Sequence, residues 1–362
     1  MAHVTGLSTL TAYGPGLTAL WDGISSGTPA VSPVTRFETR HHRAHHAAVL
    51  PGDPDLFEAL RGLVEEACTQ AGLTPEQRAT TPLVLAVHAG RDTTAKAAAL
   101  AEACGLRGVA AIHTAACAAS NSALADAAEL ITYLVEDRVV VAGGSFVDPS
   151  MFAAFDSAGI LTAEGVSRPF SAGRSGPILG DGAAAAVLER DGSRPDLPGA
   201  WLRVTGWGNT SEAHHVVRPR ADGRGPAEAI TKALARAGSP RVGYVNAHAT
   251  ATPAFDAAEA AAILRGLAGQ PGDPGGAADV RVSSTKALHG HCLEGSGLVE
   301  MAVCALSFRN GRLPVNAGFA GPDADCPLNL VLDTGQAPET GHMLSLNTGF
   351  GGVSTALVLA AP

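Results

Sequence analysis

The sequence predicts an α/β fold built in layers, with helices covering both faces of its sheets. Strand-like segments that are apolar at every position alternate along the chain with helix-like segments. A strand without a polar face must be covered on both sides, which is typical of sheets packed between helices. The composition agrees, because 46% of the 362 residues are hydrophobic but only 4% are aromatic. A core of mostly small side chains requires helices that lie close to the sheets.

The predicted elements follow from these patterns in chain order. Residues 53–73 begin with Asp53 and Pro54, which are helix start signals, and Gly72 marks the end of their apolar stripe. Residues 82–90 and 138–145 are continuous apolar runs of the kind that forms buried strands. By the same criteria we expect strands at 183–190, 244–248, 280–285, 344–349 and 356–361, and helices near 226–237, 256–267 and 296–309.

The chain is expected to divide into two similar halves. Residues 189–201 are rich in Pro, Gly and Asp and lie near the middle of the sequence. Each half contains a strand that leads into a helix and, later, a strand that ends in glycines. We therefore predict an N-terminal half over residues 1–195 and a C-terminal half over 196–362. Residues 266–279 have the composition of a surface loop.

Charge and cysteine usage narrow the classes of partner and compartment. The net charge is −9 without a long basic tract, which argues against nucleic acid as the main partner. No apolar run approaches the roughly 20 residues of a membrane helix, and the N-terminus lacks the pattern of a signal peptide. The six cysteines form no CxxC pair and no disulfide-like spacing, so we expect no metal site and a cytoplasmic location.

Cys117 is the first residue that indicates chemistry. It lies in the segment "IHTAACAASNSALADAAELI", where a strand-like approach meets a run with apolar residues at helical spacing. A thiol at a helix N-terminus has a lowered pKa and becomes a nucleophile. Taken alone, however, a cysteine among alanines is more often a buried core residue.

Two later segments place basic side chains at the ends of predicted strands. "NAHATATP" (246–253) carries His248, and "SSTKALHGHCLEGSGLVE" (283–300) carries Lys286, His289 and His291. Glu300 follows nine residues after His291, within a predicted helix. A single histidine at a strand end is usually structural. Two such histidines, a lysine and a helix-start cysteine in one α/β chain indicate an active site.

A glycine-rich segment, "LNTGFGGVS" (346–354), completes the candidate site. Gly349, Gly351 and Gly352 allow close backbone approach and leave N–H groups free, as an oxyanion hole requires. By itself this is a weak signal, because glycine-rich turns are common.

Taken together, these segments resemble those of the β-ketoacyl synthases, which are condensing enzymes of the thiolase superfamily. The resemblance extends nearly from end to end. It includes residues 4–38, the "AAC" turn with its helix, "AGILTAEGVSRPFSAGRSGPILGDGAAAAVLE" (158–189), residues 243–263 and 282–303, and "GFGG" (349–352), in the family's order. The fold that this implies is thiolase-like, with duplicated βαβ halves in a layered α-β-α-β-α arrangement.

The resemblance also implies a role for each residue of the site. Cys117 would carry an acyl chain as a thioester. His248 and His291 would hold the thioester carbonyl of a malonyl-type extender and assist loss of carbon dioxide. Lys286 would pair with Glu300 and tune the field near the histidines. The activity implied is a decarboxylative Claisen condensation, as in polyketide or fatty-acid synthesis.

Further implications concern the oxyanion hole, the substrates and the partners. Backbone N–H groups of Cys117 and Thr348 would form the oxyanion hole, beside Gly349 and Phe350. No bound cofactor is expected. The substrates would arrive on phosphopantetheine arms of acyl carrier proteins, and the enzyme would be a homodimer or a heterodimer with a second ketosynthase-like subunit.

The sequence departs from the family pattern in two places that bear on the site. Thr348 stands at a position that we associate with a bulky gating phenylalanine, so we expect an entrance without that gate. The segment 90–111 is much shorter than usual, which affects the acyl pocket and the dimer contact.

Three functions are compatible with the sequence. The first is an active ketosynthase, and the second is a partner subunit resembling a chain-length factor, which shapes a shared tunnel. The third is an acyltransferase that uses Cys117 without decarboxylation. Chain-length factors usually lose the cysteine, so the retained set of side chains favours catalysis.

A basic segment is the candidate for carrier docking. "RFETRHHRAHH" (36–46) places Arg36, Arg40 and Arg43 among four histidines. Carrier proteins are acidic and this chain carries net negative charge, so docking needs a local positive patch.

Overall fold

The computed structural model describes residues 1–195, 198–269 and 276–362, and within them strands and helices form two halves of the same design. The N-terminal half contains β1 (Ala2–Thr11), β2 (Gly14–Pro15), α1 (Gly16–Ser26), β3 (Ser32–Pro33), β4 (His46–Ala47), α2 (Leu56–Gln70), α3 (Pro75–Thr80), β5 (Pro82–Ala86), α4 (Thr93–Ala103), β6 (Gly108–His113), the 3₁₀ turn η1 (Ala116–Ala118), α5 (Ala119–Thr132), β7 (Arg138–Ser145), α6 (Pro149–Ser157) and β8 (Gly182–Arg190).

The C-terminal half repeats this series with shorter strands. It contains β9 (Leu202–Ser211), α7 (Arg224–Arg236), β10 (Tyr244–Asn246), α8 (Pro253–Gly266), the turn η2 (Gly276–Asp279), β11 (Arg281–Ser283), α9 (Lys286–His289), the turn η3 (Leu293–Gly295), α10 (Ser296–Asn310), β12 (Asn329–Leu330), β13 (His342–Gly349) and β14 (Val353–Ala360).

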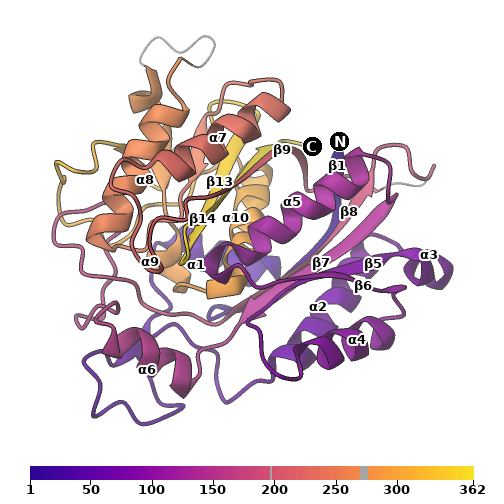
Figure 1. Ribbon diagram of the computed structural model, residues 1–362, viewed down its shortest axis with the longest axis horizontal. Helices are drawn as coiled ribbons and strands as arrows, with labels where there is room; N and C mark the ends of the chain where they lie inside the picture. Colours follow the sequence, from indigo (N-terminus) through magenta and orange to yellow (C-terminus); the bar gives the residue numbers. More distant parts are fainter. Residues whose placement is uncertain (196–197, 270–275) are drawn as a thin grey trace.

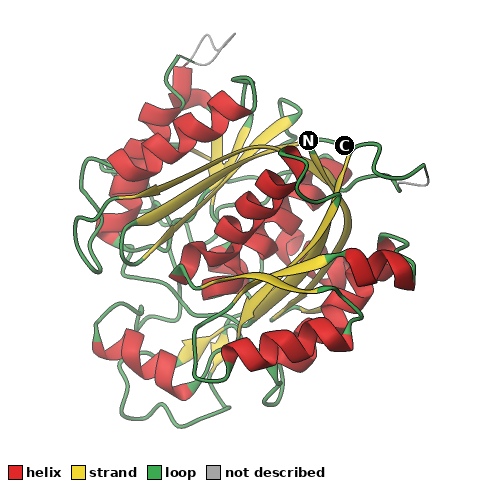
Figure 2. Ribbon diagram, turned by 45° about the vertical axis from the view of Figure 1, so that its right-hand side comes forward, coloured by secondary structure: helices red, strands yellow, loops and turns green. Residues whose placement is uncertain are grey.

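The sheet topology confirms the predicted duplication. The N-terminal half has the strand order β1-β8-β7-β5-β6, and the C-terminal half has the matching order β9-β14-β13-β10-β11, with the short β12 added at the edge beside β11. Strand β5 is parallel to β6 and β7, just as β10 is parallel to β11 and β13. Strands β8 and β14 are antiparallel to both of their neighbours. A short β1–β9 pairing joins the halves, and both chain ends lie near this junction (Figure 2).

The elements stack in five layers, as predicted. Helices α2 and α4 cover the outer face of one half, α7 and α8 cover the outer face of the other, and α5 and α10 pack between the two halves (Figure 1). Both central helices are buried along most of their length. The turn η1 leads into α5 and the turn η3 leads into α10, and both turns are largely buried. The start of each central helix therefore lies in the interior of the molecule.

Glycines in the first strand of each half allow the outer helices to pack closely. A Cβ at Gly6 of β1 would lie 2.0 Å from the Ala67 carbonyl oxygen of α2. In β9, a Cβ at Gly206 would lie 2.1 Å from the Ala233 carbonyl oxygen of α7. Each helix therefore touches the strand backbone directly, which confirms the expectation from the Ala- and Gly-rich composition.

The predicted helices and strands are all present, but several more exist. The strands β1, β6 and β9 and the helices α1, α4 and α6 are absent from the predicted set. In β1, polar residues interrupt the apolar run yet are buried: Thr5 Oγ1 donates to Glu189 (2.6 Å) and Ser8 Oγ donates to the Leu63 carbonyl (2.7 Å). The predicted boundary after residue 195 adjoins 196–197, and part of the predicted loop falls at 270–275; both segments lie outside the described residues.

Candidate active site

The turn that presents Cys117 is strained and tightly packed. Strand β6 leads into the turn η1, in which Cys117 precedes the first residue of α5, Ala119. The preceding residue, Ala116, has a φ of 48°, in the left-handed region that residues with a side chain rarely adopt. A Cβ at Gly349 would lie 2.6 Å from the Ala115 carbonyl oxygen. The glycine-rich turn after β13 therefore packs directly against the nucleophile turn.

His291 contacts the thiol directly. Its Nε2 lies 3.0 Å from Cys117 Sγ, and its Nδ1 lies 3.1 Å from Ser296 Oγ at the start of α10. The two residues come from different halves and are 174 positions apart in the sequence. This contact gives the thiol proton a direct acceptor.

His248 is oriented by a chain of buried polar groups. Lys286 Nζ donates to Glu300 Oε1, and Asn347 Nδ2 donates both to Glu300 Oε2 (2.7 Å) and to His248 Nδ1 (3.4 Å). An amide nitrogen only donates, so His248 Nδ1 accepts and its proton resides on Nε2. The His248 and His291 rings meet edge to face, with centroids 5.4 Å apart. The site thus presents one N–H donor beside the histidine that contacts the thiol.

Glu259 holds the backbone of His248 in place. Its Oε1 accepts from the His248 N–H and its Oε2 from the Ala249 N–H, both at 2.7 Å. Glu259 is a buried residue of α8, and burial raises the pKa of its carboxyl to about 8.

The protonation state of Cys117 differs from the one expected for a thiol at a helix start. Burial raises the pKa of Cys117 to about 12, with the negative charge of Glu294 as the next cause, so the predicted lowering at a helix start is wrong. Burial and the charge of Lys286 hold the pKa values of His248 and His291 well below their usual range. The resting site therefore contains a thiol and neutral imidazoles, and the thiolate must form by proton transfer to His291.

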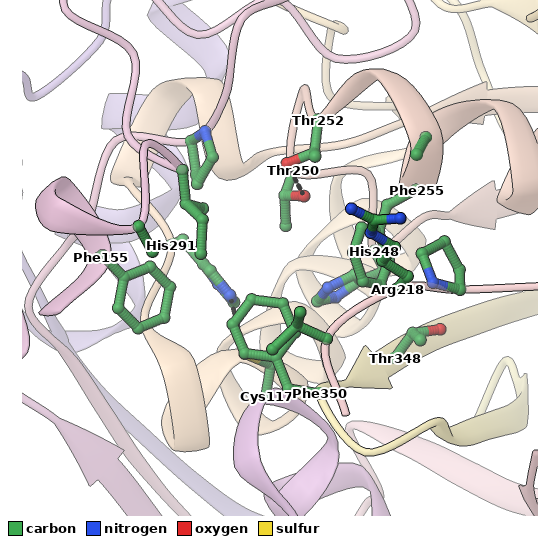
Figure 3. A pocket seen from close by; sticks show the side chains of 16 residues that line it. Cys117, Phe155, Arg218, His248, Thr250, Thr252, Phe255, His291, Thr348 and Phe350 are labelled. Carbon is green, nitrogen blue, oxygen red and sulfur yellow. Dashed lines mark hydrogen bonds between the residues drawn. The ribbon is translucent and has the colours of Figure 1, made fainter. Parts of the chain in front are cut away.

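A cavity of about 350 Å³ opens over Cys117 and is mostly apolar (Figure 3). Phe350 in the lining packs between Phe155 of α6 and Phe255 of α8, with ring centroids 5.8 Å and 5.9 Å away. The expectation that Thr348 leaves the entrance without the gating phenylalanine stays a prediction; Phe350, two residues further along the chain, supplies an aromatic ring to the cavity lining. Lining residues are Cys117, Phe155, Ala158, Ile160, Pro177, Val217, Arg218, Pro219, His248, Thr250, Thr252, Ala254, Phe255, His291, Thr348 and Phe350.

Thr348 lines the same cavity from the end of β13. It pairs with Ser354 in the β13–β14 ladder, so that the chain reverses over Gly349 and Phe350 directly above η1. An oxyanion hole from the Cys117 and Thr348 N–H groups stays a prediction. His289, in contrast, faces away from the cavity and contacts Thr285 Oγ1 at 2.9 Å.

The predicted docking arginines do not form one patch. Arg36 is internal: its guanidinium pairs with the buried Asp181 at 2.6 Å and donates to three carbonyl groups. Its assignment as a docking residue is wrong, because this ion pair anchors the loop to the core. Arg40 and Arg43 are exposed, and their docking role stays a prediction.

Sequence reasoning missed three residues that position the site. These are Asn347, Ser296 and Glu259, each within or beside a segment that we singled out. Only Asn347 had a possible signal, since a polar amide ends a predicted buried strand and must find partners there. No helix among the described residues is both long and apolar enough to cross a membrane.

Comparison with known proteins assigns the family. A model of the β-ketoacyl synthase N-terminal domain matches residues 65–193, and one of the C-terminal domain matches 202–320. The chain is 30% identical over 432 aligned residues to the oxytetracycline polyketide putative beta-ketoacyl synthase 1 of Streptomyces rimosus, covering 99% of this chain and 96% of that protein. It is 38% identical over 250 residues to the tetracenomycin ketoacyl synthase alpha subunit of Streptomyces glaucescens, covering 66% of this chain but 57% of that relative.

Solved structures agree on the fold. The ishigamide ketosynthase/chain length factor superposes with a TM-score of 0.87 at 22% identity, covering 100% of this chain and 99% of the other. A beta-ketoacyl synthase from Burkholderia phymatum gives a TM-score of 0.86 at 22% identity, with the same coverage. Both domain models match the chain, and the Streptomyces rimosus relative aligns with it along almost the whole length of both proteins. Together with the geometry around Cys117, these matches show that the chain belongs to the β-ketoacyl synthase family.

Proposed function

We propose that this protein is a ketosynthase that condenses a Cys117-bound acyl chain with a malonyl-type extender on an acyl carrier protein. One observation carries the proposal: Cys117 Sγ, His291 Nε2 and the His248 ring meet at the floor of one cavity. That combination joins a nucleophile with its proton acceptor and a second neutral donor, as acyl transfer followed by decarboxylation requires.

The first half-reaction loads the acyl chain. Cys117 gives its proton to His291 Nε2 at 3.0 Å, and the thiolate attacks the carbonyl of the incoming thioester. A bond forms between Sγ and the acyl carbon, and the carrier thiolate leaves and recovers the proton. Because the thiol pKa is raised, this transfer occurs only with substrate in place rather than in the resting enzyme.

The second half-reaction uses His248 as a neutral donor. Loss of carbon dioxide from the extender leaves an enolate whose oxygen needs N–H donors in a water-poor site. His248 presents Nε2–H because Asn347 occupies its Nδ1. The enolate carbon then attacks the acyl carbonyl, the bond to Sγ breaks, and the product leaves as a β-ketoacyl thioester on the carrier.

The cavity fits a phosphopantetheine arm. Arg218 at the rim is the one permanently charged side chain among its lining residues in the described part of the chain, matching the single phosphodiester of the arm. The Thr250 and Thr252 hydroxyls, which contact one another at 3.0 Å, offer polar partners for the arm's amides.

The decisive experiment combines product analysis with detection of carbon dioxide. The protein is incubated with acyl-carrier and malonyl-carrier substrates, and the wild type is compared with Cys117→Ala. We expect a Cys117 adduct, carbon dioxide and a β-ketoacyl product from the wild type only. Acyl transfer without carbon dioxide would instead identify the non-decarboxylating acyltransferase. Absence of an adduct, with increased turnover of a second ketosynthase, would identify a partner resembling a chain-length factor.

Several assignments belong with this proposal. We assign one half to residues 1–195 and the other to 196–362, with the active site between them. The enzyme works in the cytoplasm, in keeping with six free cysteines. It pairs with a second copy or a ketosynthase-like subunit, and Arg40 and Arg43 face the acidic carrier.

A further inference from the structure

Glu294 is a buried carboxylate beside the nucleophile that the proposed mechanism does not use. It lies in η3, which packs against the η1 turn of Cys117. Its side chain is 5% exposed, and its Oε2 has no hydrogen-bond partner in the described part of the structure. A buried carboxylate oxygen without a partner is costly, so its retention requires an explanation.

The surroundings do not neutralise this carboxylate. Its one ionic contact among the described residues runs from Oε1 to His88 Nδ1 at 3.4 Å, and the His88 side chain is 70% exposed. Lys286 is engaged by Glu300 rather than by Glu294. The charge of Glu294 acts on the Cys117 thiol across the contact between η3 and η1. In a medium of low dielectric constant such a field is strong.

We propose that Glu294 is a positioning residue that selects the charge of the group attached to Cys117. Its carboxylate disfavours a second negative charge next to Sγ, so that uncharged acyl chains load onto the cysteine and malonyl groups do not. Loading forms the Sγ–acyl bond, breaks the carrier thioester and returns the thiol proton to the carrier through His291. The bond changes are the same for both thioesters, so the carboxylate of the malonyl group is the feature on which Glu294 acts.

This inference deepens the proposed function, on which its consequence for substrate order rests. It explains how one cavity sorts two thioesters that arrive on the same arm. The uncharged chain becomes the covalent intermediate, whereas the extender keeps its carboxylate until decarboxylation removes the charge.

A pair of small alkylating reagents tests the charge selection without any carrier substrate. Iodoacetamide and iodoacetate react with the same thiolate, so the ratio of their rates cancels the thiolate fraction and reports the penalty on the anionic reagent. Peptide mapping follows Cys117, with 2-mercaptoethanol as an uncharged reference thiol. We expect wild-type Cys117 to prefer iodoacetamide more strongly than the reference does, and Glu294→Gln to reduce that preference roughly tenfold.

A second readout uses the pH profile of iodoacetamide modification. The ionisable groups that act on the thiol are Glu294 from η3, Lys286 from α9 and Glu300 from α10, and His291 and His248 lie beside it. Removing the Glu294 charge should move the profile to lower pH, which a merely structural defect would not do. Glu164→Gln is the matched control, because it also removes one carboxylate, but Glu164 is 55% exposed and pairs with Arg168.

Two outcomes would overturn the inference. One is a wild-type reagent preference equal to that of 2-mercaptoethanol, which needs no variant. The other is an unchanged ratio in both Glu294→Gln and Glu294→Ala, where the second variant covers poor folding of the first. Mass analysis with malonyl and acetyl carrier thioesters adds the natural substrates, and we expect malonyl adducts to rise relative to acetyl adducts in Glu294→Gln. Failure of the proposed function appears separately, as absence of condensation product from the wild type.

Discussion

The turns η1 and η3 occupy corresponding places in the two halves and use the same backbone geometry for different chemistry. Each precedes a central helix, and each begins with a residue at positive φ, Ala116 at 48° and Leu293 at 44°. The first presents Cys117 among alanines, whereas the second follows His291 and carries Glu294. The duplicated fold therefore has two strained turns that pack against one another. The nucleophile Cys117 lies on η1, whereas its proton acceptor His291 precedes η3 and the carboxylate of Glu294 lies on η3.

Removing the nucleophile of the N-terminal half, Cys117, has the largest expected effect on activity. Cys117→Ala deletes the one cysteine among the lining residues in the described part of the chain, so acyl loading and condensation should both disappear while the melting temperature hardly changes. Intact-protein mass after incubation with acyl-carrier protein measures the loading. An acyl adduct that persists on this variant would assign the nucleophile to another residue.

Changes on the C-terminal side should separate the two half-reactions. His248→Ala removes an enolate donor that does not touch Sγ, so carbon dioxide release should fall by about 10²-fold or more while loading continues. His291→Ala should slow both steps, since Nε2 also receives the thiol proton. Parallel assays of loading and of labelled carbon dioxide make the comparison. Equal losses in both assays for His248→Ala would contradict the division of roles.

The contact between the glycine-rich turn and η1 should be sensitive to one methyl group. Gly349→Ala places a Cβ 2.6 Å from the Ala115 carbonyl oxygen, so the Cys117 turn must shift. We expect kcat/KM to fall at least tenfold and stability to fall by about 1–3 kcal/mol. Gly62→Ala in α2 is the control, because its Cβ would meet no atom within 4 Å and stability should rise slightly. Similar activities of the two variants would show that the turn tolerates displacement.

The pH dependence of stability should report the clamp on His248. Burial raises the folded-state pKa of Glu259 to about 8, above the usual value of 4.5, so the unfolded chain releases this proton first. The free energy of unfolding should therefore decrease between about pH 5 and pH 8, by roughly 3–4 kcal/mol from this group. Denaturant titrations of wild type and Glu259→Gln test this. The variant should show a shallower dependence, with the buried Asp256, whose pKa is raised to about 7, accounting for part of the remainder.

The smallest effect is expected at the rim of the cavity. Arg218→Gln should raise KM several-fold for thioesters of phosphopantetheine but not for thioesters of N-acetylcysteamine, which has no phosphate. Arg220→Gln is the matched control, because Arg220 is already paired with Asp222 at 2.9 Å. If Arg218→Gln changes neither KM, the phosphate binds elsewhere.

The sequence predicted the layers and most of the residues that meet at the site. Strands such as 138–145 are apolar throughout, and this property alone requires cover on both faces. The two histidines and Lys286 were recognisable because each lies at the end of a predicted strand, and Glu300 because it lies in the helix that follows. Cys117 was recognisable because it lies at the start of a helical pattern. Strands with buried hydroxyl groups, such as β1, escaped prediction because their polar residues find partners only in the folded protein.

Tertiary structure decided the electrostatics and the contacts between distant segments. Sequence position suggested a lowered thiol pKa at Cys117, but enclosure by both halves raises it. Basic character suggested that Arg36 is a surface residue, but Asp181, 145 positions away, holds it inside. The sequence by itself determined the period of apolar residues and the reactive groups available, because these are properties of neighbouring residues. Desolvation, ion pairing and the meeting of η1 with η3 depend on atoms far apart along the chain, so only the folded structure determines them.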